Sequence, residues 1–389
     1  MGERIAVVGT GETPHTLRRP DVNQAELANE AVRAALEDAQ LTLKDIDIVI
    51  SSNIELLDGC YNSDMWLAEC NGAYLKPGFK VQSGGTTGST VSEQAFNLAA
   101  TGLFNTVLAV TFQRGDEGST AAGFRRIVED AFMNTGPGSA GAPVGVYFHA
   151  SWGYDLLSRG ACTEEHAAAL RVKESICASK NPNAHLRKVF TKEDVMNSRM
   201  LVTPVRLYHM CPNSTGACAI IVAPEKKAKK ITNRPAWIKD SVTVHGGRRV
   251  TGAKGRPWSW GIEQAAIKLY KSCGITNPRQ EIDVIEIYDA STWQEIGEYE
   301  DLHICEYGEP WKLIEEGATA LDGDIPVNPS GGVIATNATG DSAMLRIAEA
   351  AMQIRGTAGE HQVPDVRQAL ASTMGGWDYS TAVLFTKNL

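Results

Sequence analysis

Residues 79–110 read FKVQSGGTTGSTVSEQAFNLAATGLFNTVLAV. A short apolar lead stops at a turn rich in glycine and threonine, residues 82–88. Apolar residues then recur at helical spacing over residues 89–102, and a β-branched run follows at residues 106–111. This order of strand, glycine turn and helix start presents a reacting group or an oxyanion to the positive end of a helix.

The turn has no nucleophile at its centre. Enzymes that use such a turn commonly carry a reactive side chain on it. Here residues 84–87 read GGTT, and the serines nearest to them, Ser83 and Ser89, are peripheral. The sequence therefore predicts an active-site turn that works without a covalent nucleophile.

Composition predicts a globular chain with material for one large or two medium domains. It has 389 residues, of which 43% are hydrophobic and 21% charged. A net charge of −9 gives no overall attraction to nucleic acid or to an anionic membrane surface. No apolar run approaches the roughly 20 residues of a membrane helix, and the start, MGERIAVVGTG, reads as strand and turn. We expect a cytoplasmic protein without nucleic-acid or membrane partners.

The eight cysteines show no C-x-x-C spacing and lie mostly in apolar or helical patterns. We therefore expect free thiols and no metal on this chain. Gly9-Thr10-Gly11 does not extend to G-x-G-x-x-G, so it indicates a dinucleotide site only weakly.

Two parts of the chain share the order helix, turn and strand. A helical pattern over residues 24–39 precedes a buried strand over residues 45–51, and a helix over residues 261–273 precedes a strand over residues 281–289. The related strings IDIVI and IDVIEI stand about 236 residues apart. We infer an internal duplication.

A glycine pair opens a helical pattern in each half, Gly84-Gly85 in the first and Gly331-Gly332 in the second. Two equivalent loops are expected to face one shared cleft. Residues 113–204 are richer in charge and helix signals and read as a long insertion over the mouth of that cleft. Strands that alternate with helices, twice, predict an α/β fold of two similar layered halves.

A family pattern occupies the middle of the chain. Its matching positions are Asn181-Pro182, Ala184, Arg187-Lys188, Glu193-Asp194-Val195, Ser198-Arg199-Met200, Pro204, Arg206, Cys211-Pro212, Ser214, Gly216-Ala217 and Ala219. With this pattern and its two halves, nearly the whole chain resembles thiolases of the sterol-carrier-protein type.

The resemblance implies a thiolase fold, in which two duplicated βαβαβαββ-type halves form a five-layered αβαβα core. It implies a first half in residues 1–112 and 205–240, an inserted loop domain over the active site in residues 113–204, and a second half in residues 241–389. It also implies a homodimer, which we expect to form through the strand at residues 107–111. Members commonly act with a small zinc-ribbon/OB-fold subunit, which implies a heterotetramer.

The chain departs from the family pattern at the catalytic positions. Gly85 stands where the acyl-accepting cysteine belongs, and Tyr288-Asp289-Ala290-Ser291 replaces H-D-C-F. Asn337 stands nearest to the histidine of G-H-P, and residues 373–376, TMGG, replace a C-x-G-G loop. Without these groups the chain cannot run the two-step acyl-enzyme mechanism.

Some relatives share these departures. The steroid side-chain aldolases resemble this chain in the Tyr-Asp pair and the glycine-rich turn, although their C-terminal tyrosine has no match in residues 332–341. The acetyltransferase of phloroglucinol rings shares the Tyr-Asp pair but keeps its loop cysteine, and benzoylsuccinyl-CoA thiolase is another relative. The resemblance implies carbon–carbon bond cleavage in a bulky branched or aromatic or cyclic acyl-CoA, with coenzyme A as substrate or thioester carrier.

Cleaving the Cα–Cβ bond of a thioester leaves an enolate, which needs donors aimed at its oxygen. We assign this task to the turn at Gly84-Gly85 and to Asn337. A 3-hydroxyl substrate needs only a base and follows a retro-aldol route, whereas a 3-oxo substrate needs direct attack by the sulfur of coenzyme A. Tyr288 can be the acid or base of either route if its pKa, near 10 in water, is lowered. Asp289 either orients Tyr288 or caps a turn.

One loop, residues 246–260, gathers basic and aromatic side chains in an acidic chain. Arg248, Arg249, Lys254 and Arg256 are candidates for the phosphates of coenzyme A, and Trp258 for its adenine. The alternative is a solvated loop or a subunit contact.

The other candidates for chemistry are interpreted as structural: His149, His209, His245, His303, Cys211 and Cys305. For the whole chain, the alternative to an enzyme is a non-catalytic subunit that binds acyl-CoA or scaffolds a complex.

Overall fold

The computed structural model describes residues 3–118, 144–246, 260–375 and 379–388. Within these residues one mixed sheet has the strand order β3-β2-β4-β7-β1-β8-β11-β10-β9. The strands of its first part are β1 (Ile5–Glu12), β2 (Ile48–Ser52), β3 (Gly78–Phe79), β4 (Val107–Arg114) and β7 (Thr215–Pro224). Those of its second part are β8 (Ala236–His245), β9 (Val284–Ile287), β10 (Gln368–Gly375) and β11 (Tyr379–Thr386).

The two parts of the sheet repeat one topology. In the first, β2 runs parallel to β3 and β4, and β7 runs antiparallel to β4 and β1. In the second, β9 runs parallel to β10, and β11 runs antiparallel to β10 and β8. A parallel bridge from Ile285 to Val327 stands in the place of β3. The predicted duplication is confirmed, since β1, β2, β4 and β7 correspond in order to β8, β9, β10 and β11.

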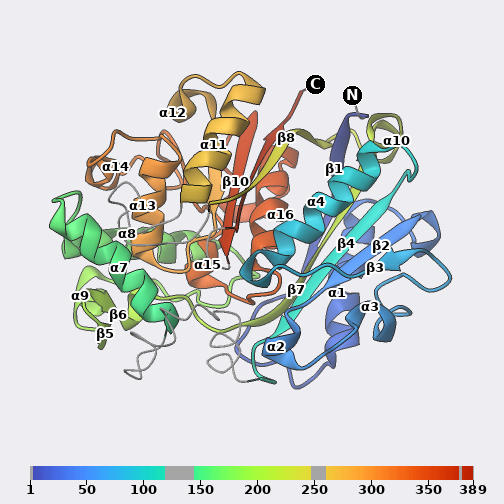
Figure 1. Cartoon of the computed structure of the whole chain (residues 1–389), viewed down its shortest axis with the longest axis horizontal. Helices are drawn as coiled ribbons and strands as arrows, with labels where there is room; N and C mark the ends of the chain where they lie inside the picture. The colour runs from blue at the N-terminus through green and yellow to red at the C-terminus, as the bar shows by residue number, and fades with distance from the viewer. Residues whose placement is uncertain (1–2, 119–143, 247–259, 376–378, 389) are drawn as a thin grey trace.

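Four helices complete the layers: α1 (Gln24–Asp38), α4 (Thr87–Ala100), α11 (Trp260–Cys273) and α16 (Ser342–Arg355). α4 and α16 lie in the middle (Figure 1), and their apolar side chains share one core with strands of both halves, including Phe96, Met344 and Phe385. α1 covers the outer face of the first part of the sheet and α11 that of the second. The predicted αβαβα order of a thiolase fold is therefore confirmed.

The glycines of β1 serve the packing of α1. A Cβ on Gly11 would lie 2.2 Å from the carbonyl oxygen of Ala31, and one on Gly9 would lie 2.7 Å from that of Ala35. Only glycine leaves room for the helix to lie this close to the strand. The Gly-x-Gly pattern is thus explained without a nucleotide.

Residues 144–206 pack against the second half. They contain α7 (Val144–Ser158), α8 (Glu164–Lys180), α9 (Lys192–Met196), β5 (Met200–Val202) and β6 (Val205–Arg206). Trp152 of α7 and Leu170 of α8 share a core with Trp293 of α13 (Thr292–Asp301), and Figure 1 shows these helices together at one end of the molecule. Residues 144–204 of the predicted insertion therefore belong to the wall of the second half, whereas residues 113–114 complete β4.

The remaining described helices are short: α2 (Glu55–Asp58), α3 (Ser63–Trp66), α10 (Glu225–Ile231), α12 (Pro278–Glu281), α14 (Pro310–Glu315) and α15 (Gly332–Ala335). Turns of 3₁₀ type occur at Leu43–Asp45, Gly84–Thr86, Leu207–His209 and Gly359–His361. Among the described residues, no helix is both long and apolar enough to cross a membrane.

Two details differ from the sequence predictions. β4 lies between β2 and β7, and its backbone is already paired on both sides. The prediction that a dimer forms through residues 107–111 is therefore wrong, and β3 is the strand at that edge of the sheet. The predicted boundary at residue 241 falls inside β8, which begins at Ala236 and pairs along its length with β11.

Candidate active site

The two central helices meet at their first turns. A Cβ on Gly88 of α4 would lie only 2.3 Å from the backbone nitrogen of Met344 in α16, so glycine is required there. The free N–H groups and positive ends of both helices are therefore close together. Gly375, at the end of β10, lies against the turn before α4, since its Cβ would be 2.7 Å from the carbonyl carbon of Gly85. The start of α4, the start of α16 and the end of β10 thus lie close together, and we take this junction as the candidate active site.

The turn before α4 is held by its own hydroxyl groups. Gly84 has φ +62, in the left-handed region that favours glycine. The Thr86 hydroxyl donates to the carbonyl oxygen of Ser83 at 2.9 Å, and the Thr87 hydroxyl donates to that of Gly84 at 2.7 Å. These hydroxyls serve the backbone, and Gly85 brings only its peptide groups to the site.

Tyr288 follows β9 directly and is fixed by β10, because its backbone N–H donates to the carbonyl oxygen of Ser372 at 2.9 Å. Its ring packs against Val333 and Ala343 and is 6% exposed. Burial, with a smaller effect of the Cys211 thiol, raises the pKa of the phenol above its ordinary value. The lowered pKa required for a base is not found. Tyr288 is a neutral phenol and hence a proton donor.

Asn337 precedes α16 and presents its amide to Cys211, whose side chain packs against the cluster of Tyr288, Val333 and Ala343. Its Nδ2 donates to the sulfur of Cys211 at 3.1 Å, and its Oδ1 accepts from the Ser342 hydroxyl at 3.0 Å. These two contacts fix which way the amide faces. Because an amide nitrogen carries two N–H groups, one can still serve a ligand oxygen after Cys211 has taken the other.

Cys211 was expected to be a packing residue, yet it lies at the site. Burial raises the pKa of its thiol to about 12, and the hydrogen bond from Asn337 offsets this only partly. At neutral pH the group is a thiol, which is a weak nucleophile compared with a thiolate. Its place beside Asn337 follows from the way the loop before β7 returns to the second half, which the C-P pair does not reveal.

Sequence reasoning missed two more residues of this wall. The Ser214 N–H donates to the Asn337 carbonyl oxygen at 2.9 Å, and the Asn337 N–H donates to the Ser214 hydroxyl oxygen at 3.1 Å. His185 Nδ1 lies 2.9 Å from the same hydroxyl oxygen. The available signal was their position inside the two family strings, N-P-N-A-H and C-P-N-S.

Asp289 serves the second glycine turn. Its Oδ1 accepts a hydrogen bond from the Val333 N–H at 2.6 Å, and a Cβ on Gly332 would lie 2.4 Å from the same oxygen. Among the described residues no hydrogen bond joins Asp289 to the Tyr288 hydroxyl. Its carboxylate therefore supports the turn that leads to Asn337.

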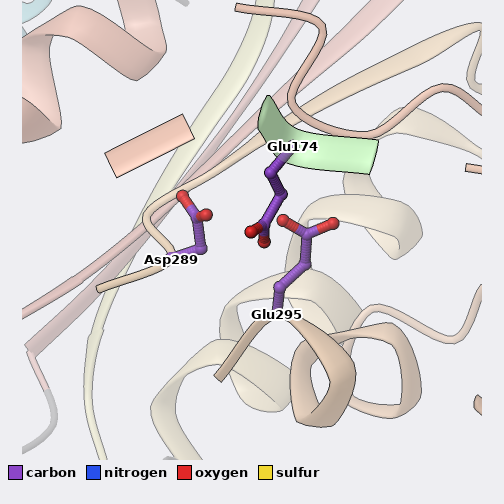
Figure 2. Close-up of side chains that lie close together, drawn as sticks. All are labelled: Glu174, Asp289 and Glu295. Carbon is purple, nitrogen blue, oxygen red and sulfur yellow. The ribbon is translucent and has the colours of Figure 1, made fainter. Parts of the chain in front are cut away.

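Asp289 also belongs to a buried acidic cluster with Glu174 and Glu295 (Figure 2), in which one oxygen of each lies within 4.8 Å of the others. Lys173 donates to Glu295 at 2.7 Å, and Asn328 donates to its second oxygen at 2.8 Å. Burial and the two neighbouring carboxylates raise the pKa of Glu174. The Lys173 ammonium offsets part of the negative charge that the three carboxyl groups would carry.

The remaining candidates lie away from Tyr288 and Asn337, or outside the described residues. The indole N–H of Trp293 donates to Nδ1 of His209 at 3.2 Å, and Nδ1 of His149 lies 2.9 Å from the Ser291 hydroxyl oxygen. The ring of His245 stands edge-on to the ring of Tyr379, with 4.7 Å between the ring centroids. The candidates for coenzyme A binding, Arg248, Arg249, Lys254, Arg256 and Trp258, all lie outside the described residues.

Comparison with known proteins agrees with this architecture. Residues 253–388 match the family described as Thiolase C-terminal domain-like. The chain is 28% identical over 395 residues to the acetyl-CoA acetyltransferase of Methanothermobacter thermautotrophicus, covering 97% of this chain and 98% of that protein. The predicted resemblance to thiolases is confirmed.

The chain is also similar to proteins of the kind that the sequence analysis named, a benzoylsuccinyl-CoA thiolase and a steroid lyase. The chain is 31% identical over 222 residues to benzoylsuccinyl-CoA thiolase subunit BbsB of Thauera aromatica, covering 55% of this chain and 56% of that protein. It is 27% identical over 371 residues to the 17-hydroxy-3-oxo-4-pregnene-20-carboxyl-CoA lyase of Mycobacterium tuberculosis, covering 92% and 93%. The solved structure of an Ltp2-ChsH2(DUF35) aldolase has the same fold, with a TM-score of 0.83, 24% identity and coverage of 100% and 99%.

Proposed function

We propose that this chain cleaves the Cα–Cβ bond of a 3-hydroxyacyl-CoA by a retro-aldol route, with no acyl-cysteine. One observation carries the proposal. Cys211 lies between two candidate groups: its sulfur accepts from the Asn337 amide, and its side chain packs against the cluster that holds the neutral phenol of Tyr288, whereas the turn before α4 offers only Gly85 and the Cys211 thiol is protonated.

The proposed reaction moves one proton from oxygen to carbon. The 3-hydroxyl loses its proton and becomes a carbonyl, the Cα–Cβ bond breaks, and its electron pair forms the thioester enolate. Asn337 and the backbone at Gly84-Gly85 stabilise the enolate oxygen, at about 100- to 1,000-fold in rate for one such donor. Tyr288 gives its proton to Cα and takes the proton of the 3-hydroxyl, so the phenol ends as it began.

The state of Tyr288 favours this route over thiolysis of a 3-oxoacyl-CoA. Thiolysis also needs a base that turns coenzyme A into a thiolate. Tyr288 and Cys211 both have raised pKa values, so neither is such a base at neutral pH. In the retro-aldol route both proton transfers accompany cleavage of the Cα–Cβ bond, so Tyr288 becomes a base only as it gives its own proton to Cα, and no separate base is needed.

Substrate and partners are proposed from the relatives. A lyase of a pregnene carboxyl-CoA and a thiolase of benzoylsuccinyl-CoA support a bulky branched or cyclic acyl group. We propose that the phosphates of coenzyme A bind to the basic residues at positions 248–256. We also propose a homodimer that carries a small zinc-ribbon/OB-fold subunit. The name of the similar aldolase structure, Ltp2-ChsH2(DUF35), joins two proteins and supports such a partner.

The test is turnover of 3-hydroxy- and 3-oxoacyl-CoA panels, by the chain alone and with its small subunit. We expect the 3-hydroxy panel to give a ketone or aldehyde and a shorter thioester that carries one deuterium at Cα in D₂O. Tyr288→Phe should lower kcat by about 100- to 10,000-fold. Tyr154→Phe, at a tyrosine that is 70% exposed on α7, is the matched control and should change nothing.

Two outcomes contradict the proposal. One is an acyl adduct on any thiol of the chain during turnover. The other is tight acyl-CoA binding without turnover of either panel when the small subunit is present, which would instead support a non-catalytic binding subunit.

A further inference from the structure

Ser214 makes two hydrogen bonds with Asn337, and the proton of its own hydroxyl takes part in neither. Its N–H donates to the Asn337 carbonyl oxygen at 2.9 Å, and its hydroxyl oxygen accepts from the Asn337 N–H at 3.1 Å. Ser214 is fully buried, so the proton of its own hydroxyl needs an acceptor within the protein. His185 Nδ1, at 2.9 Å, is placed to be that acceptor.

We propose that His185 is a positioning residue for Asn337, which it holds through the hydroxyl of Ser214. The inference rests on the proposed function, in which the Asn337 amide binds the enolate oxygen. It adds to that site a residue from the predicted insertion, residues 113–204. It also assigns a tautomer to His185, with the proton on Nε2 and the lone pair of Nδ1 facing Ser214.

The backbone around His185 is fastened to the same wall. The His185 N–H donates to the Thr336 hydroxyl oxygen at 3.1 Å, and the Leu186 N–H donates to the Ala335 carbonyl oxygen at 3.0 Å. These partners directly precede Asn337 in the chain. The ring of His185 and the amide of Asn337 are therefore positioned by one connected set of hydrogen bonds.

The charge state of His185 agrees with its role as an acceptor. Burial, and then the neighbouring His15, lower the pKa of the His185 ring. His15 is itself held by the Asp341 carboxylate at 3.1 Å, and Asp341 stands at the start of α16. A neutral ring keeps the lone pair on Nδ1, whereas an imidazolium would turn an N–H toward Ser214 and abolish the acceptor.

Loss of the acceptor should act on kcat more than on KM. The Ser214 hydroxyl would turn to another acceptor and release the Asn337 N–H, which shifts the amide. A misplacement of about 1 Å at a group that binds the transition state costs about 100-fold in rate. Contacts with coenzyme A are made elsewhere in the proposed site, so substrate binding is largely kept.

The kinetic test uses the full chain with its small subunit, three single variants, one double variant and a control variant. His185→Leu and Ser214→Ala should each lower kcat about 10- to 100-fold, with KM changed less than threefold, and the double variant should be no worse than either. His185→Asn keeps an acceptor oxygen near the place of Nδ1 and should recover most of the loss. The control is His303→Asn, at an exposed residue with φ +55 that asparagine tolerates.

A second readout needs no turnover and separates this inference from the proposed function. Nitrogen-15 NMR of the resting protein should show His185 protonated on Nε2, and His185→Leu should shift the side-chain amide signal of Asn337. A proton on Nδ1, an unmoved Asn337 signal, or a folded His185→Leu variant with full kcat would overturn the inference. If the tautomer and the shift appear but no panel substrate reacts, only the proposed function fails.

Discussion

Replacing Gly88 by alanine tests the contact that brings α4 and α16 together at the site. The new Cβ would stand 2.3 Å from the backbone nitrogen of Met344 and 3.0 Å from the Met344 Cβ. Ordinary van der Waals contacts of a Cβ begin at 3.4 Å. To raise the distance from 2.3 Å to this value, the first turns of the two helices must separate by about 1 Å. Because the obstacle is backbone, a side-chain rotation cannot relieve it.

The cost follows from this separation. Overpacking of a well-packed core costs about 1–3 kcal/mol, and Gly88→Ala should destabilise the protein by that amount. The matched control is Gly297→Ala, at a buried helical glycine of α13 whose Cβ would meet nothing within 4 Å. There alanine should stabilise by about 0.5–1 kcal/mol, because it lowers the entropy cost of ordering the helix.

Urea unfolding of both variants, followed by circular dichroism, measures the two effects. The expected result is a lower midpoint for Gly88→Ala and a higher one for Gly297→Ala. The same 1 Å shift should also lower kcat of Gly88→Ala by about 100-fold. A Gly88→Ala protein as stable as the parent chain would refute the close helix contact.

Three other groups give further tests. The pKa of His209 is lowered to about 4 by burial. As the pH falls, the imidazole of the unfolded chain is therefore protonated at a higher pH than that of the folded chain, which favours unfolding. About 3 kcal/mol of stability should be lost as the pH falls from 6.5 to 4, and urea midpoints should show a smaller loss in His209→Asn. Cys211, with its pKa raised from 9.0 to about 12, holds about a thousandfold less thiolate than an ordinary cysteine. Mass spectrometry after iodoacetamide at pH 8 should find it far less labelled than Cys70, and equal labelling contradicts its raised pKa. Glu174→Gln should change stability at pH 8 only slightly, because the raised pKa makes the ionised form unfavourable in the folded state and this offsets the loss of the 3.8 Å ion pair with Arg171. Glu295→Gln should lower stability by about 3–5 kcal/mol, since it leaves Lys173 without its buried partner; the opposite order of midpoints would rule out this assignment of charge.

Much of the fold was readable from local patterns. The helix of residues 24–39 and the strand of residues 45–51 show the periods of buried elements, and the strings near Ile46 and Ile282 reveal the duplication. These signals are local because hydrophobic spacing fixes which face of each element is buried. Strand order is not local, and the dimer contact expected from the family resemblance therefore fell on β4, which the sheet encloses on both sides.

The site was only partly readable. Gly85, Tyr288, Asp289 and Asn337 could be named because each occupies a position of the family pattern that the chain resembles. Their states could not, because a pKa depends on burial and on neighbours distant in sequence. Tyr288 was expected to need a lowered pKa and has a raised one, and Asp289 turns to Val333.

The amino-acid order by itself determined the two layered halves, the glycine turns and the absence of a nucleophile from the first of them. It could do so because turn chemistry and hydrophobic period act between residues a few positions apart. Only the tertiary structure decided that Cys211, Ser214 and His185 join Asn337. These residues are brought together by loops from separate parts of the chain, and their hydrogen bonds exist only once both halves have closed around α4 and α16.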